Sequence, residues 1–435
     1  MDPIRAMELF DYQRDGVAWM VNRERSQDPG GFLCDEMGLG KTIQMIWTMK
    51  VNKVPKTLII VPNSLVAQWE QELEKHNENA TVTTYSKFIR PNTMMTEHWD
   101  RVILDEGHEI RTKKTKRFKN ICAIPSKIRW VITGTPIYNK EDEYINLRSF
   151  ILQGPKKLPR NKILLRRTKD DVGLNIPRLS FENVELDMSD DEWREYSFAF
   201  DEYAGKVMSG MQILSAFTHM RQLSIHPALI DSEYTGGSAK IERLVSDIRS
   251  HPDEKSIVFC QFLREMDLIQ ESLGKQTIVR LDGSVDQDKR QKLVDFFNNS
   301  RRKSGKAFDK DCPAPVFIIQ VKTGGQGLNL QSATRVYITS PTWNPATELQ
   351  AVARAHRTGQ TRHVHVKRYV YTTRSDDVNS IDESLVRMHE RKSQVTSQIL
   401  EDPRITRQIP VALRNISVQE IRKIFSRQVP NGICS

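Results

Sequence analysis

The sequence predicts an α/β fold with two lobes, each a parallel sheet flanked by helices, on either side of a helical insert. Short apolar runs alternate with helical stretches up to about residue 151, and a second such series begins near residue 256. Apolar runs that lead into polar or glycine-bearing turns are typical of buried parallel strands in α/β crossover units. Between the two series, residues 189–226 have a helical pattern.

The expected strands of each lobe follow from these runs. In the first lobe they are 31–34, 57–61, 101–105 and 130–133, and in the second 256–262, 277–281, 316–321 and 335–339. The helical insert opens with Ser189 three residues before Glu192, a capping-box pattern. In sheets of this kind, ligand-binding residues gather at the carboxyl ends of the strands.

Length and composition bound the remaining possibilities. A chain of 435 residues suggests two or three domains, and its 38% hydrophobic content is sufficient for real cores. The formal charge of +10 favours a polyanionic partner, although a solvated basic surface is the commoner cause of such a charge.

Cysteine usage and hydropathy exclude several classes of protein. The five cysteines are far apart and form no C-x-x-C pair, which argues against a disulfide framework and against a zinc module. The N-terminus lacks the apolar core of a secretory signal, and runs such as 58–61 are far too short to cross a bilayer. The expectation is an intracellular protein without a membrane partner. The cysteines are Cys34, Cys122, Cys260, Cys312 and Cys434.

The stretch DEMGLGKT, residues 35–42, nearly fits the phosphate-loop pattern, except that Asp35 stands where the strict form has glycine. Gly38 and Gly40 allow backbone N–H groups to approach phosphate oxygens. Lys41 supplies charge and Thr42 a hydroxyl for Mg²⁺. The alternative is a chance strand-to-helix turn that holds two glycines.

Two further segments carry candidate catalytic groups. The apolar strand in RVILDEGH, residues 101–108, ends in Asp105, which suits a water-mediated Mg²⁺ ligand, and Glu106, which suits a base for the attacking water. In ELQAVARAHRTGQ, residues 348–360, Arg354 and Arg357 would share one face of a helix and could reach a transferred phosphate across a cleft. The alternative for the arginines is an ordinary charged surface helix.

With these segments in this order, the chain resembles a Swi/Snf-like ATPase, a double-stranded-DNA translocase of the DExH-box helicase superfamily, over residues 8–395. In that family DEMGLGKT is the usual first motif, so Asp35 is the family's own variant. Other matching segments are LFDYQRDGVAWM (9–20), LIIVPNSLVAQWEQE (58–72), VITGTPIYN (131–139), LLRRTKDDV (164–172), MRQLSIHP (220–227), LDGSVDQDKRQ (281–291), KTGGQGLNL (322–330), PTWNPATELQAVARAHRTGQ (341–360) and SIDESLVRMHERK (380–392).

The resemblance implies a domain organisation. The expected parts are a RecA-like lobe at 1–155, a lobe junction and helical insert at 156–238, a second RecA-like lobe at 239–375, and a brace helix with an unassigned tail at 376–435.

The resemblance also implies ATP and Mg²⁺ as cofactors, with Gln13 on the adenine and Arg354 and Arg357 completing the site when the lobes close. Thr42 and Asp105 are the implied metal ligands. The implied ATP-binding residues are Gln13, Asp35, Glu36, Met37, Gly38, Leu39, Gly40, Lys41, Thr42 and Gln350, and the implied catalytic residues are Lys41, Asp105, Glu106, Arg354 and Arg357.

Double-stranded DNA is the implied partner, with DNA-bound proteins as further targets. Phosphate contacts are expected from Lys322, Thr323 and Gly324, and from Arg166 and Arg167. The densest basic run is a further candidate, although a solvated face explains it equally well. It consists of Arg111, Lys113, Lys114, Lys116, Arg117 and Lys119.

Some features leave the function open. Gly107, Gln326 and Ala353 depart from the commonest family residues. The segments 19–24 and 343–346 favour the branch of helicase-like transcription factors and post-replication repair translocases, but the chain lacks the cysteines of that branch's RING finger. Two alternatives are an RNA- or DNA-unwinding DExH helicase and a catalytically weak nucleic-acid-binding scaffold.

Overall fold

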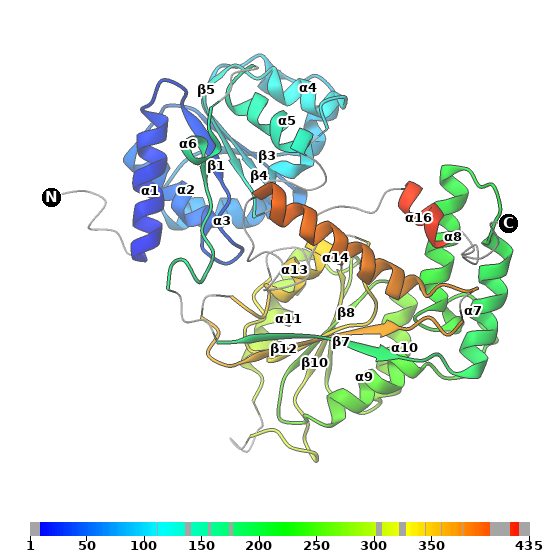
Figure 1. Ribbon diagram of the computed structural model, residues 1–435. Coiled ribbons are helices and arrows are strands. Elements are labelled where there is room, and N and C mark those ends of the chain that lie inside the picture. The colour runs from blue at the N-terminus through cyan, green and yellow to red at the C-terminus, as the bar shows by residue number, and fades with distance from the viewer. Residues whose placement is uncertain are drawn as a thin grey trace. The chain divides into compact units, whose positions relative to one another are not determined.

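The chain forms two compact units, residues 1–176 and 177–435, each with its own sheet. The computed structural model describes residues 9–110, 112–134, 141–154, 158–173, 177–301, 307–321, 328–343, 345–357, 359–375, 377–400 and 418–425 (Figure 1). Both sheets consist of parallel strands flanked by helices, which confirms the predicted α/β fold with two RecA-like lobes.

The sheet of the first unit has the strand order β3-β2-β4-β5-β1-β6, and every pairing in it is parallel. The apolar runs predicted as strands all lie in it, because a strand buried on both faces must be apolar throughout. The strands are β1 (Gly30–Leu33), β2 (Thr57–Val61), β3 (Thr81–Thr84), β4 (Trp99–Asp105), β5 (Ser126–Ile132) and β6 (Leu164–Leu165).

Helices cover both faces of this sheet. On one face, α1 (Asp11–Glu24), α2 (Lys41–Val51) and α3 (Val66–Lys75) pack their apolar side chains against the strands. On the other face, Tyr144 of α5 (Glu141–Ile151) stacks on Phe32 of β1, with ring centroids 5.2 Å apart. The remaining helices are α4 (Lys116–Cys122) and the short α6 (Arg160–Ile163).

The sheet of the second unit has the order β7-β12-β11-β8-β10-β9, again wholly parallel. Its strands are β7 (Leu179–Leu186), β8 (Ser256–Cys260), β9 (Ile278–Leu281), β10 (Val316–Gln320), β11 (Arg335–Ile338) and β12 (Val364–Tyr371).

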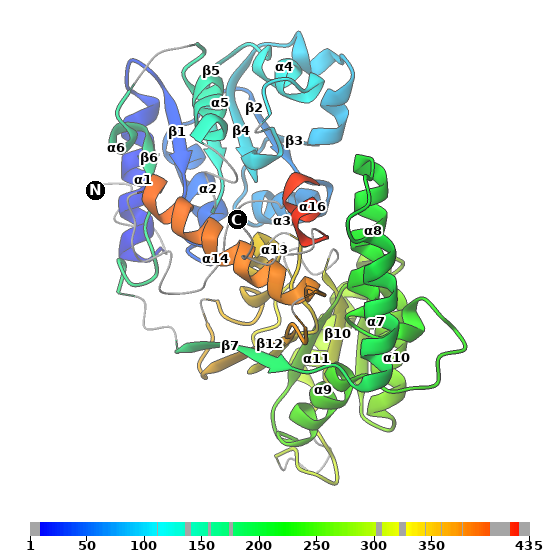
Figure 2. The same ribbon diagram turned by 45° about the vertical axis from the view of Figure 1, so that its right-hand side comes forward.

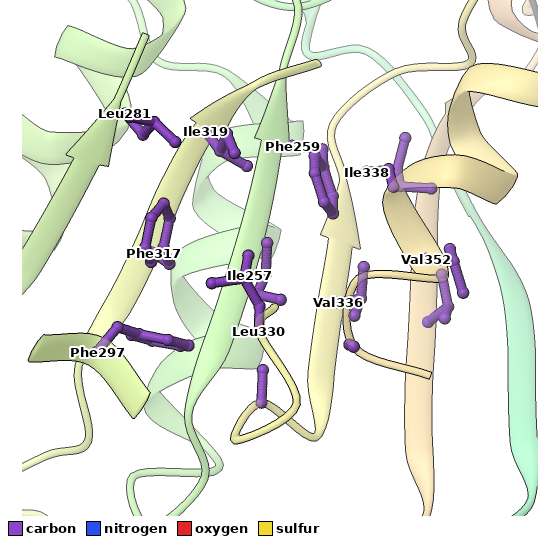
Figure 3. Packing of buried hydrophobic residues seen from close by; sticks show 14 of the residues in the cluster. Ile257, Phe259, Leu281, Phe297, Phe317, Ile319, Leu330, Val336, Ile338 and Val352 are labelled. Atoms are coloured by element: carbon purple, nitrogen blue, oxygen red, sulfur yellow. The ribbon is translucent and has the colours of Figure 1, made fainter. Parts of the chain in front are cut away.

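Each face of the second sheet has its own core. α9 (Ala239–Arg249) and α10 (Leu263–Leu273) pack on one face. On the opposite face, Figure 3 shows Phe297 and Val352 with strand residues such as Phe317 and Ile257. Phe297 belongs to α11 (Gln287–Asn299) and Val352 to α13 (Pro345–Val352), so this face positions the end of α13.

The second unit also has a helical part (Figure 2), whose buried side chains form a third core. It joins the predicted insert, α7 (Asp190–Tyr203) and α8 (Gly210–Leu223), to α14 (Ile381–Leu400) and α16 (Val418–Ile424). The predicted capping box at Ser189 is present. No sequence pattern had indicated α16, whose neighbour Phe425 packs its ring against Phe200 and accepts a hydrogen bond from the Gly205 N–H at 3.1 Å.

Four strands were not predicted: β3, β6, β7 and β12. The segment 156–238, predicted as lobe junction and insert, contributes β6 to the first sheet and β7 to the second. Within the residues that the structure describes, no helix is both long and apolar enough to cross a membrane. Over the same residues, no three His, Cys, Asp or Glu side chains are grouped as a metal site would require.

Candidate nucleotide-binding site

The phosphate loop connects β1 to α2, as the sequence predicted. Gly38 and Gly40 have φ angles of +93° and +73°, in the left-handed region where a side chain is disfavoured. A Cβ on Gly40 would also lie 2.5 Å from Gln13 Nε2 and would displace the Gln13 amide. α2 begins at Lys41, directly after Gly40, and its N-terminus therefore adjoins the loop. This arrangement suits an anion.

Lys41 lies over the loop itself. Its ammonium donates hydrogen bonds to the carbonyls of Asp35, at 2.9 Å, and Glu36, at 3.4 Å. A Cβ on Gly134 would lie 3.6 Å from Lys41 Nζ and 3.2 Å from Met37 Cγ. The segment that follows β5 therefore lies close to the loop, and the absence of a side chain at Gly134 leaves room for Met37 and Lys41.

Gln13 of α1 is buried against the same loop. Its amide nitrogen donates to the Leu39 carbonyl at 3.3 Å, and its amide oxygen accepts from the Phe10 N–H at 3.1 Å. These bonds fix the side chain beside the glycines of the loop. A contact of Gln13 with adenine stays a prediction. Thr42, the predicted metal ligand, is half-buried in the first turn of α2.

Asp35 has several polar partners within the fold. Its carboxylate is fully buried. It accepts from Gln44 Nε2 at 3.1 Å and from Arg167, which binds it through its backbone N–H and its Nε, each at 3.1 Å, and also through Nη2. Glu36 binds the same segment, because its carboxylate pairs with Lys169 Nζ at 3.5 Å and accepts from the Lys169 N–H at 2.9 Å.

The two predicted acids lie at the carboxyl end of β4. Asp105 accepts from the Trp69 indole at 2.8 Å and from the Glu106 N–H at 2.9 Å. Glu106 has a left-handed backbone with φ of +50°, which is unusual for a side-chain-bearing residue other than asparagine or aspartate. Its carboxylate lies 3.3 Å from His108 Nδ1.

Electrostatics links these acids to the loop. Burial raises the pKa of Asp105 to about 6, and the charge of Glu106 acts in the same direction. The Trp69 hydrogen bond and the positive charge of Lys41 lower the pKa of Asp105, against those two effects. The positive charge of Lys41 thus acts on Asp105, and the loop and the acids follow the carboxyl ends of β1 and β4, two parallel strands of one sheet.

The predicted arginines lie in the second unit, together with Gln350. The expectation that Arg354 and Arg357 share a helical face is wrong, because α13 ends at Val352. After Val352 the chain forms a turn, in which the N–H groups of Arg354 and Ala355 each donate to the carbonyl three residues earlier, at 3.1 Å. Gln350, half-buried, lies within α13.

Polar contacts hold this arginine-bearing turn in place. The side-chain amide of Gln360 donates to the carbonyls of Ala355, at 3.1 Å, and Gln331, at 2.9 Å. The Leu330 N–H donates to the Arg354 carbonyl at 3.0 Å. Burial lowers the pKa of Arg357, which nevertheless stays a cation at neutral pH. The closing of both arginines onto a nucleotide stays a prediction.

Gln360 and Trp69 are site residues that the sequence reasoning missed. Gln360 lies in the matching segment 341–360, and Trp69 lies in 58–72. Only the fold shows that Gln360 binds the turn that carries Arg354 and Arg357, and that Trp69 binds Asp105.

The predicted DNA contacts lie in several places. Lys322, Thr323, Gly324 and Arg111 are outside the described residues. Arg166 donates to the Gly134 carbonyl at 3.5 Å, and Arg167 binds the phosphate loop. Of the basic run at the start of α4, four lysines are exposed and Arg117 pairs with Glu109 at 2.7 Å. The four are Lys113, Lys114, Lys116 and Lys119.

Comparisons with known proteins find two family models that match this chain. Residues 12–95 and 76–160 match the SNF2-related domain, and residues 239–359 match the helicase conserved C-terminal domain. The first match contains the phosphate loop and both acids, and the second contains Gln350, Arg354 and Arg357.

Several relatives match almost the whole chain, among them a viral and a bacterial protein. One is the "Probable global transactivator" of Orgyia pseudotsugata multicapsid polyhedrosis virus, 28% identical over 97% of this chain and 95% of its own. The other is the "Putative ATP-dependent helicase/translocase YwqA" of Bacillus subtilis, 28% identical over 96% of this chain. The chain spans 51% of the bacterial protein's length.

Among solved structures, the chain is similar to "Sulfolobus solfataricus SWI2/SNF2 ATPase core in complex with dsDNA". The identity is 25% and the TM-score 0.43, over 96% of this chain and 97% of that one. The two domain matches, in this order on one chain that folds into two parallel sheets, establish the family. The chain belongs to the Swi/Snf-type ATP hydrolases of the DExH-box helicase superfamily.

Proposed function

We propose that this protein is a DNA-dependent ATPase that couples ATP hydrolysis to translocation along double-stranded DNA and thereby remodels protein–DNA complexes. One observation carries the ATPase part of the proposal. A phosphate loop with left-handed glycines presents Lys41 close enough to Asp105 to influence its pKa. The DNA part is supported by the family and by the name of the Bacillus relative, a helicase/translocase.

In this proposal the first unit binds the nucleotide. Lys41 and the loop N–H groups bind the phosphates, and Gln13 contacts the adenine. Glu106 orients the attacking water, while Arg354 and Arg357 of the second unit stabilise the charge that develops on the transferred phosphate. The two lobes would close on ATP and release after hydrolysis, advancing a DNA-holding surface at each cycle.

Mg²⁺ fits the residues proposed to hold it. Each Asp105 carboxylate oxygen accepts one described hydrogen bond, from Trp69 or from the Glu106 N–H, and so keeps a lone pair for a coordinated water. The Thr42 hydroxyl would be the direct protein ligand. When bound, the cation would neutralise phosphate oxygens.

The DNA surface is proposed on backbone chemistry alone. Lys322, Thr323 and Gly324, with Arg166 and the exposed lysines near α4, are the groups that would bind phosphates. A protein that binds DNA in this way would be located inside the cell, where DNA is handled. The branch of helicase-like transcription factors also stays a proposal, since the relatives' names cover transactivation as well as translocation.

The direct test is ATP turnover with different nucleic acids. We expect double-stranded DNA to stimulate hydrolysis at least tenfold, and single-stranded RNA to have little effect. Lys41→Ala should abolish turnover in both cases, because the phosphates lose their main cation. Stimulation by single-stranded RNA in preference to duplex DNA would instead support the unwinding helicase, and turnover in Lys41→Ala equal to wild type would reject the assigned site.

A further inference from the structure

Asp35 places a buried negative charge in the loop that is proposed to bind a triphosphate. Its carboxylate is fully buried, and its backbone carbonyl accepts a hydrogen bond from the phosphate-binding Lys41. A buried carboxylate repels an anion nearby more strongly than an exposed one does, because water screens it less. A loop with Asp35 therefore needs a compensating cation.

Arg167 provides that cation, from 132 positions further along the chain. Its guanidinium binds both carboxylate oxygens of Asp35, through Nε to Oδ1 at 3.1 Å and through Nη2 to Oδ2. Two-point pairing of this kind is a property of arginine that lysine cannot reproduce. The Arg167 N–H adds a further bond to Oδ1 at 3.1 Å.

The same guanidinium ties two helices to the loop. Nη2 also donates to Gln44 Oε1 of α2 at 2.8 Å, and Nη1 donates to the Tyr12 carbonyl of α1. The guanidinium lies over the Tyr12 ring, 5.6 Å from its centroid. Every nitrogen of the guanidinium thus has a partner in the loop or beside it, and the side chain is only 15% exposed.

Gly16 gives independent support for this junction. It lies inside α1, where glycine costs about 1 kcal/mol relative to alanine. A Cβ at this position would overlap Gln44 Oε1 and would lie 2.7 Å from Arg167 Nη2. The helix therefore has glycine where the arginine and the glutamine need room.

The chain around Arg167 is joined to the loop along its length. The Cys34 N–H donates to the Leu165 carbonyl at 2.7 Å, and the Glu36 N–H donates to the Arg167 carbonyl at 2.9 Å. These bonds continue the parallel pairing of β6 with β1. This backbone pairing places Arg167 next to Asp35.

We propose that Arg167 is a positioning residue of the nucleotide site: it neutralises Asp35 and fixes the phosphate loop so that ATP can bind. This inference rests on the proposed ATPase function and replaces the expectation that Arg167 binds DNA. It also explains why the loop tolerates aspartate at position 35.

The test separates nucleotide affinity from DNA affinity in the full chain. Binding of ATPγS without DNA is measured by calorimetry, KM for ATP and kcat are measured with saturating duplex DNA, and duplex affinity is measured without nucleotide. For Arg167→Ala we expect ATPγS affinity to fall and KM for ATP to rise tenfold or more. We expect kcat to change less, and duplex affinity to stay within twofold of wild type.

Matched variants control for charge and folding. Lys162→Ala removes an exposed positive charge nearby and should leave all three quantities unchanged. Arg167→Lys keeps the charge but loses two-point pairing, so its KM should lie between those of wild type and Arg167→Ala. Asp35→Asn combined with Arg167→Gln keeps a neutral hydrogen-bonded pair that should fold, and it should regain most of the ATPγS affinity.

An Arg167→Ala protein with wild-type KM for ATP and a tenfold loss of duplex affinity would overturn the inference and place Arg167 on DNA. Equal KM values for Arg167→Ala and the Asp35→Asn, Arg167→Gln protein would also overturn it, because charge compensation would then be irrelevant. Failure of the proposed function looks different: the wild-type protein itself would neither bind ATPγS nor hydrolyse ATP.

Discussion

The indole N–H of Trp69 donates a 2.8 Å hydrogen bond to the buried carboxylate of Asp105. This bond stabilises the ionised form, against burial and the charge of Glu106, which raise the pKa of Asp105 to about 6. Trp69 belongs to α3, so a helix with no catalytic residue of its own helps to set the protonation state of the site.

The pH dependence of ATP hydrolysis follows from this bond. The carboxylate form is required for the proposed metal ligand, so kcat/KM for ATP should fall below about pH 6, as Asp105 takes up a proton. Trp69→Phe removes the stabilising donor, so the midpoint of this fall should move to higher pH. The measurement is a pH–rate profile of both proteins.

Tyr85 offers a matched control for that profile. Its hydroxyl donates to the Asp105 backbone carbonyl at 2.8 Å and leaves the carboxylate untouched. Tyr85→Phe should therefore keep the wild-type midpoint. A midpoint that stays fixed in Trp69→Phe, or that moves equally in both variants, would contradict the role given to the indole.

Gly107 lies so close to Val131 that a side chain at position 107 would collide with it. A Cβ there would lie 2.5 Å from Cγ1 of the fully buried Val131. We expect Gly107→Ala to destabilise the protein by about 1–3 kcal/mol, as overpacking usually does, and to displace the adjacent Glu106. Urea denaturation and ATP turnover measure the two effects.

Val131→Ala tests the cause of that destabilisation. It removes the methyl group in question, so Gly107→Ala should cost clearly less stability in a Val131→Ala background than in wild type. Strictly additive losses would show that Val131 is not the reason for glycine at position 107.

Glu348 and Arg368 form a buried ion pair in the second unit. The Glu348 carboxylate also binds the segment before α13. The side chains are 2% and 1% exposed and lie 2.8 Å apart, and Glu348 also accepts from the Thr342 N–H at 2.6 Å. Glu348→Ala would leave a buried guanidinium without its carboxylate, and we expect a loss of about 3–5 kcal/mol in urea denaturation.

The exposed pair Arg264–Glu271, with side chains 51% and 63% exposed, is the control. Glu271→Ala should change stability by less than about 0.5 kcal/mol, because solvent screens such a pair. Comparable losses in the two variants would mean that burial does not decide the strength of these ion pairs.

Arg357 tests the proposed contribution of the second unit to hydrolysis. Arg357→Ala should bind ATP nearly as wild type does, yet hydrolyse bound ATP roughly 10³-fold more slowly, because the charge on the transferred phosphate loses a cation. Single-turnover hydrolysis measures this step directly. A large loss of ATP affinity with unchanged hydrolysis of bound ATP would contradict the role.

The sequence predicted most of the buried strands because short, continuous apolar runs are typical of strands covered on both faces. It missed β12, in which Lys367 and Arg368 interrupt the apolar pattern. Arg368 is buried because Glu348, twenty residues away, pairs with it, and no local pattern reports such a partner. β7 was missed for a related reason: it is an edge strand with mostly half-buried residues, so its sequence is polar.

In the candidate site, too, residues with local partners could be predicted from the sequence, and residues with distant partners could not. The loop and the acids were found from their spacing, since that chemistry depends on neighbours in the sequence. The turn at Arg354 depends on Gln360 and on Leu330, and the position of Arg167 depends on Asp35, 132 residues before it. Such contacts are set by the fold. Spacing therefore predicted a helix at Arg354, and the chemistry of phosphate binding predicted a DNA contact for Arg167.

Translocation on duplex DNA is tested most directly by displacement of a third strand from a DNA triplex. Wild-type protein with ATP should release the third strand while the two duplex strands stay paired, and the hydrolysis-deficient Glu106→Gln protein should bind ATP but release nothing. Separation of the duplex strands, or third-strand release that does not require ATP hydrolysis, would contradict the proposed function.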